Sequence, residues 1–426
     1  MLDNLTKSTY EAILVSELRP AMGCTEPIAI AYASSILKEV LGEYPDKISA
    51  KFSGNIIKNV KSVIVPATGG RHGIEAAVAA GLVSGRPDKR LEVLTVLTAD
   101  DESKIDAFLS VCPISIDKLN TRCSFELELV GHHGNDTAKV RISGAHTNVT
   151  EVTLNGENKA KKYIETTIVE ESGDAPDYNL LNVKDIIAFA DETDLEYLRP
   201  YLNRQIQLNL AIAEEGLRGK WGAQIGNVML SMGNDISRKA RAYAAAGSDA
   251  RMSGCEMPVC IISGSGNQGI TASVPVAIYA QDMGVDEDTL LRALIVSDLI
   301  TIHQKTGIGT LSAYCGAISA GVGAGAGICY LKGGRFREIA HTLVNSVAIL
   351  SGTICDGAKP SCAAKIAMAV EAGIMGYQMW QNGSQFHDGD GIVTKGVENT
   401  IKNVGRLAKE GMSDTDREII EIMLGI

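Results

Sequence analysis

The chain is poor in aromatic residues and has no cluster of positive charge. Among 426 residues there are only six phenylalanines and two tryptophans, against 44 glycines, so small and aliphatic side chains must fill most of the interior. No run of lysines or arginines stands out, and the formal net charge is −11. Nucleic-acid binding requires the opposite, a basic footprint. We therefore expect no nucleic-acid partner.

The N-terminal segment lacks the apolar core of a secretion signal, because Asp3, Glu11 and Glu17 interrupt it. The nine cysteines are an odd number and include no Cys-x-x-Cys pair. This pattern argues against a disulfide framework, a zinc ribbon and a thioredoxin motif. Together these absences favour reduced thiols and a cytoplasmic location.

One stretch, residues 307–331, lacks charges over a length that could span a membrane. It is rich in glycine and alanine and poor in leucine, isoleucine and phenylalanine. This composition favours a buried helix, or two helices with a break, over a membrane span. We expect no membrane partner.

What is present indicates a fold of mixed class. Residues 86–175 contain three segments of alternating polarity, and in the first of them Phe125, Leu127 and Leu129 share one face. From Val183 onward, helical periodicity dominates. We predict an α+β fold, in which a small α+β module with an antiparallel sheet is inserted in the N-terminal third of a mostly helical, Gly/Ala-rich catalytic body.

The predicted division of the chain has three parts. Residues 1–85 form the N-terminal part of the helical body, residues 86–175 form the α+β module, and residues 176–426 form the main helical domain. Within these parts, Arg19-Pro20 is expected to separate two helices. Residues 90–97 have the pattern of a strand.

Cys24 stands between a glycine and a Thr-Glu-Pro triplet, just ahead of an apolar run. Thr25 or Glu26 can cap a helix, and Pro27 suits its first turn. This arrangement would place the thiol at the positive end of a helix dipole, where a thiol loses its proton more easily.

Three later cysteines also invite a chemical interpretation. Cys355 and Cys362 flank a loop that contains glycine and proline and follows a predicted helix. Loops of this kind present thiolates to iron–sulfur clusters, although two cysteines at this spacing are also found as ordinary core residues. Cys315 lies among small residues that let a cofactor approach closely, and taken alone it is typical of a small buried hydrophobic residue.

Five segments together resemble the L-cysteine desulfidases, relatives of the iron–sulfur L-serine dehydratase alpha chain. They are AMGCTEPIA, SGNIIKNVKSV, SGSGNQG, HQKTGIGTLSAYCGA and CDGAKPSCAAK. The resemblance runs essentially end to end and includes the cysteine spacing. It implies a 4Fe-4S cluster held by Cys315, Cys355 and Cys362, with Cys24 as the catalytic base. It also implies that residues 176–426 are a serine-dehydratase-alpha-like domain.

The reaction implied by this resemblance is β-elimination of sulfide from L-cysteine, which yields pyruvate, ammonia and hydrogen sulfide. A cubane cluster normally takes four thiolates, so three protein ligands would leave one iron open as a Lewis acid. Cys24 could instead be the fourth ligand in the resting enzyme. L-serine dehydration on the same cluster is the closest alternative activity.

A Gly-x-Gly-x-x-Gly pattern at Gly264, Gly266 and Gly269 follows a strand-like run. A dinucleotide-binding loop has this context, but no acidic residue ends a second strand and no βα alternation surrounds it. The N–H groups of such a loop can instead cradle an anion, for which the substrate carboxylate is the natural candidate. We therefore assign substrate binding to the polar residues of this loop, with an ordinary structural turn as the competing interpretation. These residues are Ser263, Ser265, Asn267 and Gln268.

Two further positions are candidates for substrate contact. Asn55, with Lys58, belongs to one of the five segments, and its alternative is an ordinary turn with a solvated lysine. His303, with Lys305, lies near Cys315 in the sequence, and its alternative is a histidine satisfied within a helix.

Other classes of function stay open at this point. A nucleotide-dependent or pyridoxal-phosphate-dependent enzyme using the glycine loop would lack iron. A non-catalytic cluster-based or thiol-based sensor would release neither sulfide nor pyruvate. The expected partner is a small amino-acid substrate, L-cysteine, and Gly/Ala-rich helices are compatible with a homo-oligomer.

Overall fold

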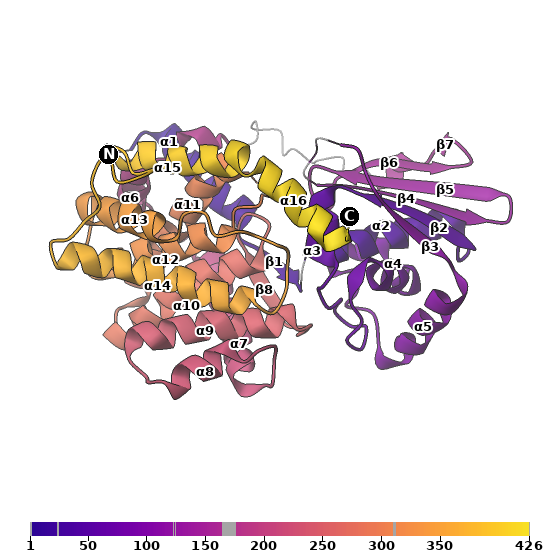
Figure 1. Cartoon of the computed structure of the whole chain (residues 1–426), viewed down its shortest axis with the longest axis horizontal. Coiled ribbons are helices and arrows are strands. Elements are labelled where there is room, and N and C mark those ends of the chain that lie inside the picture. Colours follow the sequence, from indigo (N-terminus) through magenta and orange to yellow (C-terminus); the bar gives the residue numbers. More distant parts are fainter. Residues whose placement is uncertain are drawn as a thin grey trace.

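The protein has two lobes, a large helical lobe and a smaller lobe built around a sheet (Figure 1). The structure is a computed structural model that describes residues 2–23, 25–121, 123, 125–163, 176–309 and 312–425. Helices account for most of these residues, and the strands are concentrated in the N-terminal half. The predicted α+β class is confirmed.

The smaller lobe contains a mixed sheet, whose strand order within the described residues is β3-β2-β4-β5-β6-β7. The β4–β5 hairpin has the predicted turn, with His133 opposite Asp136. β2 and β3 run parallel, because α5 (Glu102–Val111) lies in the connection between them, so the sheet is not purely antiparallel as predicted. The strands are β2 (Lys47–Phe52), β3 (Ile114–Lys118), β4 (Glu126–His133), β5 (Asp136–Ser143), β6 (Val149–Leu154) and β7 (Glu157–Asn158).

Helix α2 (Thr25–Leu41) covers one face of this sheet, and α4 (Gly73–Ser84) packs on α2. A Cβ at Gly81 would lie 2.6 Å from the Ala31 Cα, so glycine allows the two helices to approach closely. β5 buries alternate residues, as a sheet with one covered face requires.

Two expectations for this region were wrong. Residues 90–97 form no strand; a 3₁₀ helix (Pro87–Glu92) leads into turns, in which Val93 and Leu94 are buried. Apolar residues can thus be buried without strand pairing. Hydrophobic packing also groups residues 28–82 with the sheet and not with the helical body, so it does not follow the expected boundary at residue 85.

The helical lobe begins with α1 (Asn4–Glu17) and β1 (Arg19–Met22). The expected break at Arg19-Pro20 is therefore a short strand, which pairs antiparallel with β8 (Pro258–Ile261). The remaining helices of this lobe are α6 (Val183–Glu192), α7 (Arg199–Arg218), α8 (Ile225–Ser231), α9 (Ile236–Met252), α10 (Gly266–Met283), α11 (Glu287–Ile308), α12 (Gly316–Leu331), α13 (Phe336–Leu350), α14 (Cys362–Gln381), α15 (Val397–Arg406) and α16 (Ser413–Leu424).

The Gly/Ala-rich stretch forms α12, which is buried in the helical lobe and separated from α11 by a break, as predicted. A Cβ at Gly325 would lie 2.6 Å from the Gly373 Cα, so α12 and α14 are in backbone contact. Among the residues that the structure describes, no helix combines the length and the apolar character needed to cross a bilayer.

Helix α16 connects the two lobes (Figure 1, yellow). It leaves the helical lobe and packs on α3 (Gly54–Val60), where a Cβ at Gly54 would lie 2.5 Å from the Ile420 Cδ1. The buried Lys58 of α3 forms an ion pair with Asp416 of α16. Lys58 also lines a cavity between the two lobes.

Candidate functional site

A cavity lies where the two lobes meet, and both lobes supply its walls. The smaller lobe contributes Thr25, Glu26, Lys58, Asn59 and His146. The helical lobe contributes Arg251, Ser263, Gly264, Ser265, Asn267, Gln268, Lys305, Ser312, Tyr314, Cys315, Gly316, Ala317, Cys355, Gly357, Ala358, Cys362, Lys365 and Ile366.

Helices from both lobes begin at this cavity. Thr25 starts α2, Gly316 starts α12 and Cys362 starts α14, while Ser265 is the N-cap residue of α10. All of these residues line the cavity. The positive end of each helix dipole and the unpaired N–H groups of each first turn therefore face the same space, which favours anions.

Backbone pairing brings Cys315 and Cys355 together. The Cys355 N–H donates to the Ala313 carbonyl at 2.6 Å, and the Cys315 N–H donates to the Thr353 carbonyl at 3.0 Å. Tyr314 and Ile354 form an antiparallel bridge between them. Two thiols that are far apart in the sequence thus face one cavity.

The loop from Cys355 to Cys362 is held by charge. Asp356 forms an ion pair with Lys359 and accepts a hydrogen bond from Lys365 at 2.6 Å. Burial opposes ionisation of Asp356, but these two lysines outweigh it and lower the pKa of Asp356 to about 2. The Cys362 thiol lies 3.6 Å from the Gly357 carbonyl, so the loop folds back on its own second cysteine.

The electrostatics of the cavity reflect its burial. Burial and the neighbouring Cys355 thiol raise the pKa of Cys315 to about 12, and burial raises that of Cys362. Burial also lowers the pKa of Lys305 to about 8, against the opposing influence of the Cys355 and Cys315 thiols. The Cys315 and Cys362 thiols therefore keep their protons until a cationic group compensates the thiolate charge.

The donor set suits an iron–sulfur cluster better than a single ion. Among the described residues, no three His, Cys, Asp or Glu side chains are close enough together to hold one metal ion. A cubane cluster is larger than an ion, and its iron atoms take soft thiolate ligands. Cys315, Cys355 and Cys362 are free thiols around one cavity, so the residues present fit such a group.

The glycine loop lies on the same cavity. β8 leads into Ser263 and Gly264, whose φ angles are +48° and +73°, and this tight turn starts α10. The Ser265 Oγ accepts a long hydrogen bond, 3.5 Å, from the Gln268 N–H. The strand-like run predicted ahead of this loop is confirmed as β8. Within the described residues β8 pairs with β1 alone, so no parallel strand pair supports a dinucleotide site.

Two acceptors of this loop are buried without a hydrogen-bond partner. They are the Asn267 Oδ1 and the Gln268 Oε1. The Gln268 amide packs on the start of α12, since a Cβ at Gly316 would lie 2.8 Å from the Gln268 Cδ. The loop and Cys315 are therefore neighbours. A bound ligand can satisfy these acceptors.

Other predicted site residues have different surroundings. Cys24 lies outside the described residues, although Thr25 and Glu26, which follow it, line the cavity. Asn55 does not line the cavity; its helix contributes Lys58 and Asn59 instead.

His303 does not line the cavity either. Its Nε2 lies 2.7 Å from the Glu398 Oε2, and this pair joins α11 to α15. Lys305, the candidate named together with His303, does line the cavity. Its Nζ donates a hydrogen bond to the Gly309 carbonyl at 2.7 Å.

The sequence analysis did not predict several of the residues that line the cavity. Asn59 donates to Glu26 at 2.8 Å, whereas the sequence suggests for Glu26 only the role of a helix cap. His146 lies in the β5–β6 connection, and Arg251 lies near the end of α9, where a cation simply complements the helix dipole. Nothing in the local pattern distinguishes these two residues from solvated ones.

Comparison with known proteins agrees with the motifs. The serine dehydratase alpha chain family matches residues 88–421. The chain is 52% identical to a UPF0597 protein of Desulfitobacterium hafniense, over 98% of this chain and 96% of that protein. It is 47% identical to a UPF0597 protein of Lachnoclostridium phytofermentans, over 97% and 98% of the two chains. A UPF0597 protein of Finegoldia magna is 46% identical, over 97% and 99%. The chain therefore belongs to the serine dehydratase alpha chain family, and this membership supports a lyase-type function.

Proposed function

We propose that this protein is an iron–sulfur-dependent lyase that removes sulfide from L-cysteine and forms pyruvate and ammonia. The observation that carries the proposal is the meeting of Cys315, Cys355 and Cys362 at one buried cavity, beside the glycine loop. The chain belongs to the serine dehydratase alpha chain family, and dehydration of serine is also a β-elimination.

The proposed roles follow from the residues at the cavity. Cys315, Cys355 and Cys362 would hold a 4Fe-4S cluster. When bound, such a cluster would supply a Lewis-acidic iron that favours departure of the leaving group. The polar loop residues Ser263 and Ser265, with the first turn of α10, would bind the substrate carboxylate.

Cys24 is the proposed base. Its Sγ would accept the proton from the substrate Cα while the bond from Cβ to sulfur breaks, so sulfide leaves with the electron pair of that bond. The product is aminoacrylate, which tautomerises and takes up water to give pyruvate and ammonia.

L-serine dehydration is the second candidate activity, and the family name favours it. It needs the same proton removal at Cα, with hydroxide in place of sulfide as the leaving group. The two activities are separated by comparing product formation from L-cysteine and from L-serine on one preparation.

The first prediction concerns the thiols. Replacing Cys315, Cys355 or Cys362 individually with serine should remove most of the iron and abolish sulfide release, because each replacement removes a soft ligand. Cys24→Ala should keep most of the iron but lower turnover by at least about 100-fold, as expected for loss of a general base. Iron, acid-labile sulfide and sulfide release from L-cysteine would be measured on anaerobically purified protein.

Cys112→Ala is the matched control, because Cys112 is a buried free thiol in the smaller lobe, away from the cavity. It should leave both iron content and turnover near those of the original protein. Full sulfide release by iron-free protein would overturn the proposal. Loss of iron in Cys24→Ala would assign Cys24 to ligation and not to proton transfer.

A further inference from the structure

Arg251 is a buried cation at the cavity, and its position at the end of α9 gives it a helix dipole but no ion-pair partner among the described residues. The residue is 4% exposed and lines the cavity. The Nε has no hydrogen-bond partner, and no carboxylate among the described residues forms an ion pair with the guanidinium. A buried charge without a counter-ion is strongly unfavourable, so its presence points to an anion that arrives with a ligand.

The other cations of the described cavity walls are already engaged. Lys58 is paired with Asp416, and Lys365 is paired with Asp356. Lys305 donates to a backbone carbonyl. Glu26 is the acidic residue of these walls, and it accepts hydrogen bonds from Asn59 and Thr25. Among these described wall cations, Arg251 is therefore the one whose side chain has neither an ion-pair partner nor a hydrogen bond.

Arg251 also lies directly against the glycine loop. A Cβ at Gly266 would collide with the Arg251 Nε and lie 3.0 Å from its Cζ, so the guanidinium packs on the first residue of α10. A carboxylate placed there would meet both the guanidinium and the free N–H groups of the helix start. The unpartnered Asn267 Oδ1 and Gln268 Oε1 next to it are acceptors of the kind that an ammonium group needs.

We propose that Arg251 anchors the α-carboxylate of the substrate, so that the cavity selects α-amino acids over amines or thiols that lack a carboxylate. The inference rests on the proposed function for its substrate class and adds to it the residue that determines recognition. Arginine suits this task because its planar fork binds a carboxylate through two parallel hydrogen bonds, which a lysine cannot do.

The test uses two non-reacting probes, L-alanine and L-alaninamide, which differ in the carboxylate alone. Their dissociation constants would be measured by calorimetry on anaerobically purified protein. In Arg251→Gln, L-alanine should bind at least about 30-fold more weakly, because a buried charge pair is lost. L-alaninamide should bind both proteins equally weakly. Arg251→Lys should be intermediate.

Arg218→Gln is the control, because Arg218 is 81% exposed on α7. It should leave the binding of both probes unchanged. If L-alanine and L-alaninamide are discriminated as strongly by Arg251→Gln as by the original protein, the inference is wrong. Should Arg251→Gln fail to fold, the same comparison on Arg251→Lys decides, since that variant keeps the charge.

Thermal unfolding separates ligand binding from a structural role. Without ligand, Arg251→Gln should unfold at the same or a higher temperature, because an uncompensated buried charge is removed. A clear fall in the unfolding temperature would instead indicate that Arg251 supports the fold.

The two proposals can fail separately. If L-cysteine releases no sulfide but L-alanine binding still depends on Arg251, the proposed function falls and the carboxylate anchor stands. If Arg251→Gln releases sulfide from L-cysteine with an unchanged KM, the anchor falls and the proposed function stands.

Discussion

At the scale of single residues, the chemical role available to each cysteine depends on where it lies in the fold. Those within the described residues are all free thiols, in agreement with the odd count and the missing Cys-x-x-Cys pair. Cys260 and Cys329 are buried in the helical core, and burial raises the pKa of each to about 12. Cys315 is also buried but faces the cavity. A thiol in the core is inert packing, whereas the same thiol at the cavity wall is available for ligation.

Asp298 is a carboxylic acid that is fully buried on α11. It accepts one hydrogen bond, from the Gln205 Nε2 at 3.0 Å. The Asp298 Oδ2 and the Gln205 Oε1 are both buried without partners. Burial raises the pKa of Asp298 from 3.8 to about 7. A protonated carboxyl group would turn one of these orphaned acceptors into a donor.

The pH dependence of stability follows from this shift. Between about pH 4 and pH 7 the unfolded chain has already lost the Asp298 proton while the folded protein still holds it, so stability falls as pH rises through this range, by up to roughly 4 kcal/mol. Asp298→Asn cannot titrate and should escape this loss. Urea unfolding would measure the free energy of unfolding of both proteins at pH 5 and pH 8. The value for Asp298→Asn, relative to that of the original protein, should be higher at pH 8 than at pH 5. An identical difference in unfolding free energy at both pH values would contradict the assignment.

At the scale of elements, the site depends on how a loop meets a helix of the other lobe. Gly357, in the loop between two proposed ligands, has φ +94°, and a Cβ there would collide with the carbonyl of Lys58 on α3. The loop can take this path only if that position has no side chain.

Gly357→Ala should therefore displace the loop and lower the iron content by more than half, besides costing roughly 1–3 kcal/mol of stability through backbone strain. Gly352→Ala is a matched control, because Gly352 has φ +93° but no atom within 4 Å of the position that a Cβ would take. Gly352→Ala should lower the stability by a similar amount and leave the iron content unchanged. Iron content and unfolding midpoints would be measured for both, and equal iron loss in the two variants would show that the contact with Lys58 is irrelevant.

Prediction of elements from the sequence succeeded where periodicity was strong. The helical pattern of residues 183–193 predicted α6 (Val183–Glu192), and the alternation of residues 123–130 predicted most of β4 (Glu126–His133). The strand predicted for residues 90–97 was wrong, because Val93 and Leu94 are buried within turns and not in a sheet. β3 was missed, since its parallel pairing with β2 depends on α5 returning the chain to the sheet.

At the scale of the whole molecule, the two lobes are held together beside the cavity. Lys58 has a side chain that is 1% exposed, and its partner Asp416 is 19% exposed on α16. Breaking a buried pair by removing one partner leaves an uncompensated charge. The C-terminal helix therefore stabilises the junction at which the proposed site lies.

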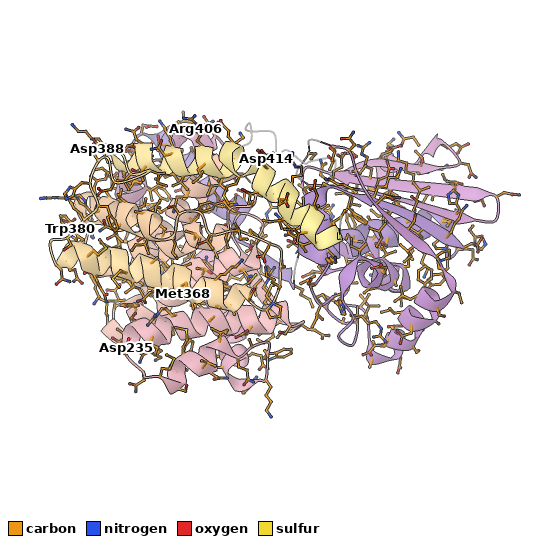
Figure 2. All side chains as sticks on the ribbon, viewed as in Figure 1. Asp235, Met368, Trp380, Asp388, Arg406 and Asp414 are labelled. Atoms are coloured by element: carbon orange, nitrogen blue, oxygen red, sulfur yellow. The ribbon has the colours of Figure 1, made fainter. Side chains whose placement is uncertain are left out.

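Asp416→Asn should destabilise the protein by about 3 kcal/mol and weaken the docking of α16 on α3. Asp414→Asn is the control on the same helix; Figure 2 labels Asp414 on α16. Asp414 is 83% exposed and pairs with Arg417. It should change stability by no more than about 0.5 kcal/mol. Chemical unfolding and hydrogen exchange in α3 would measure both, and equal effects of the two variants would refute the role given to Lys58.

The amino-acid sequence by itself determined the class of fold, the main helices, the sheet hairpins and the motif cysteines, because periodicity, capping residues and spacing are local properties that survive in one dimension. The tertiary structure alone decided which of those residues share a cavity. It placed Lys58 and Asn59 there and left Asn55 and His303 outside, and it brought in Arg251 from a helix end that carries no motif. The physical reason is that convergence depends on packing between lobes, where a close glycine contact, a backbone bridge or a buried ion pair fixes neighbours that are far apart in the chain.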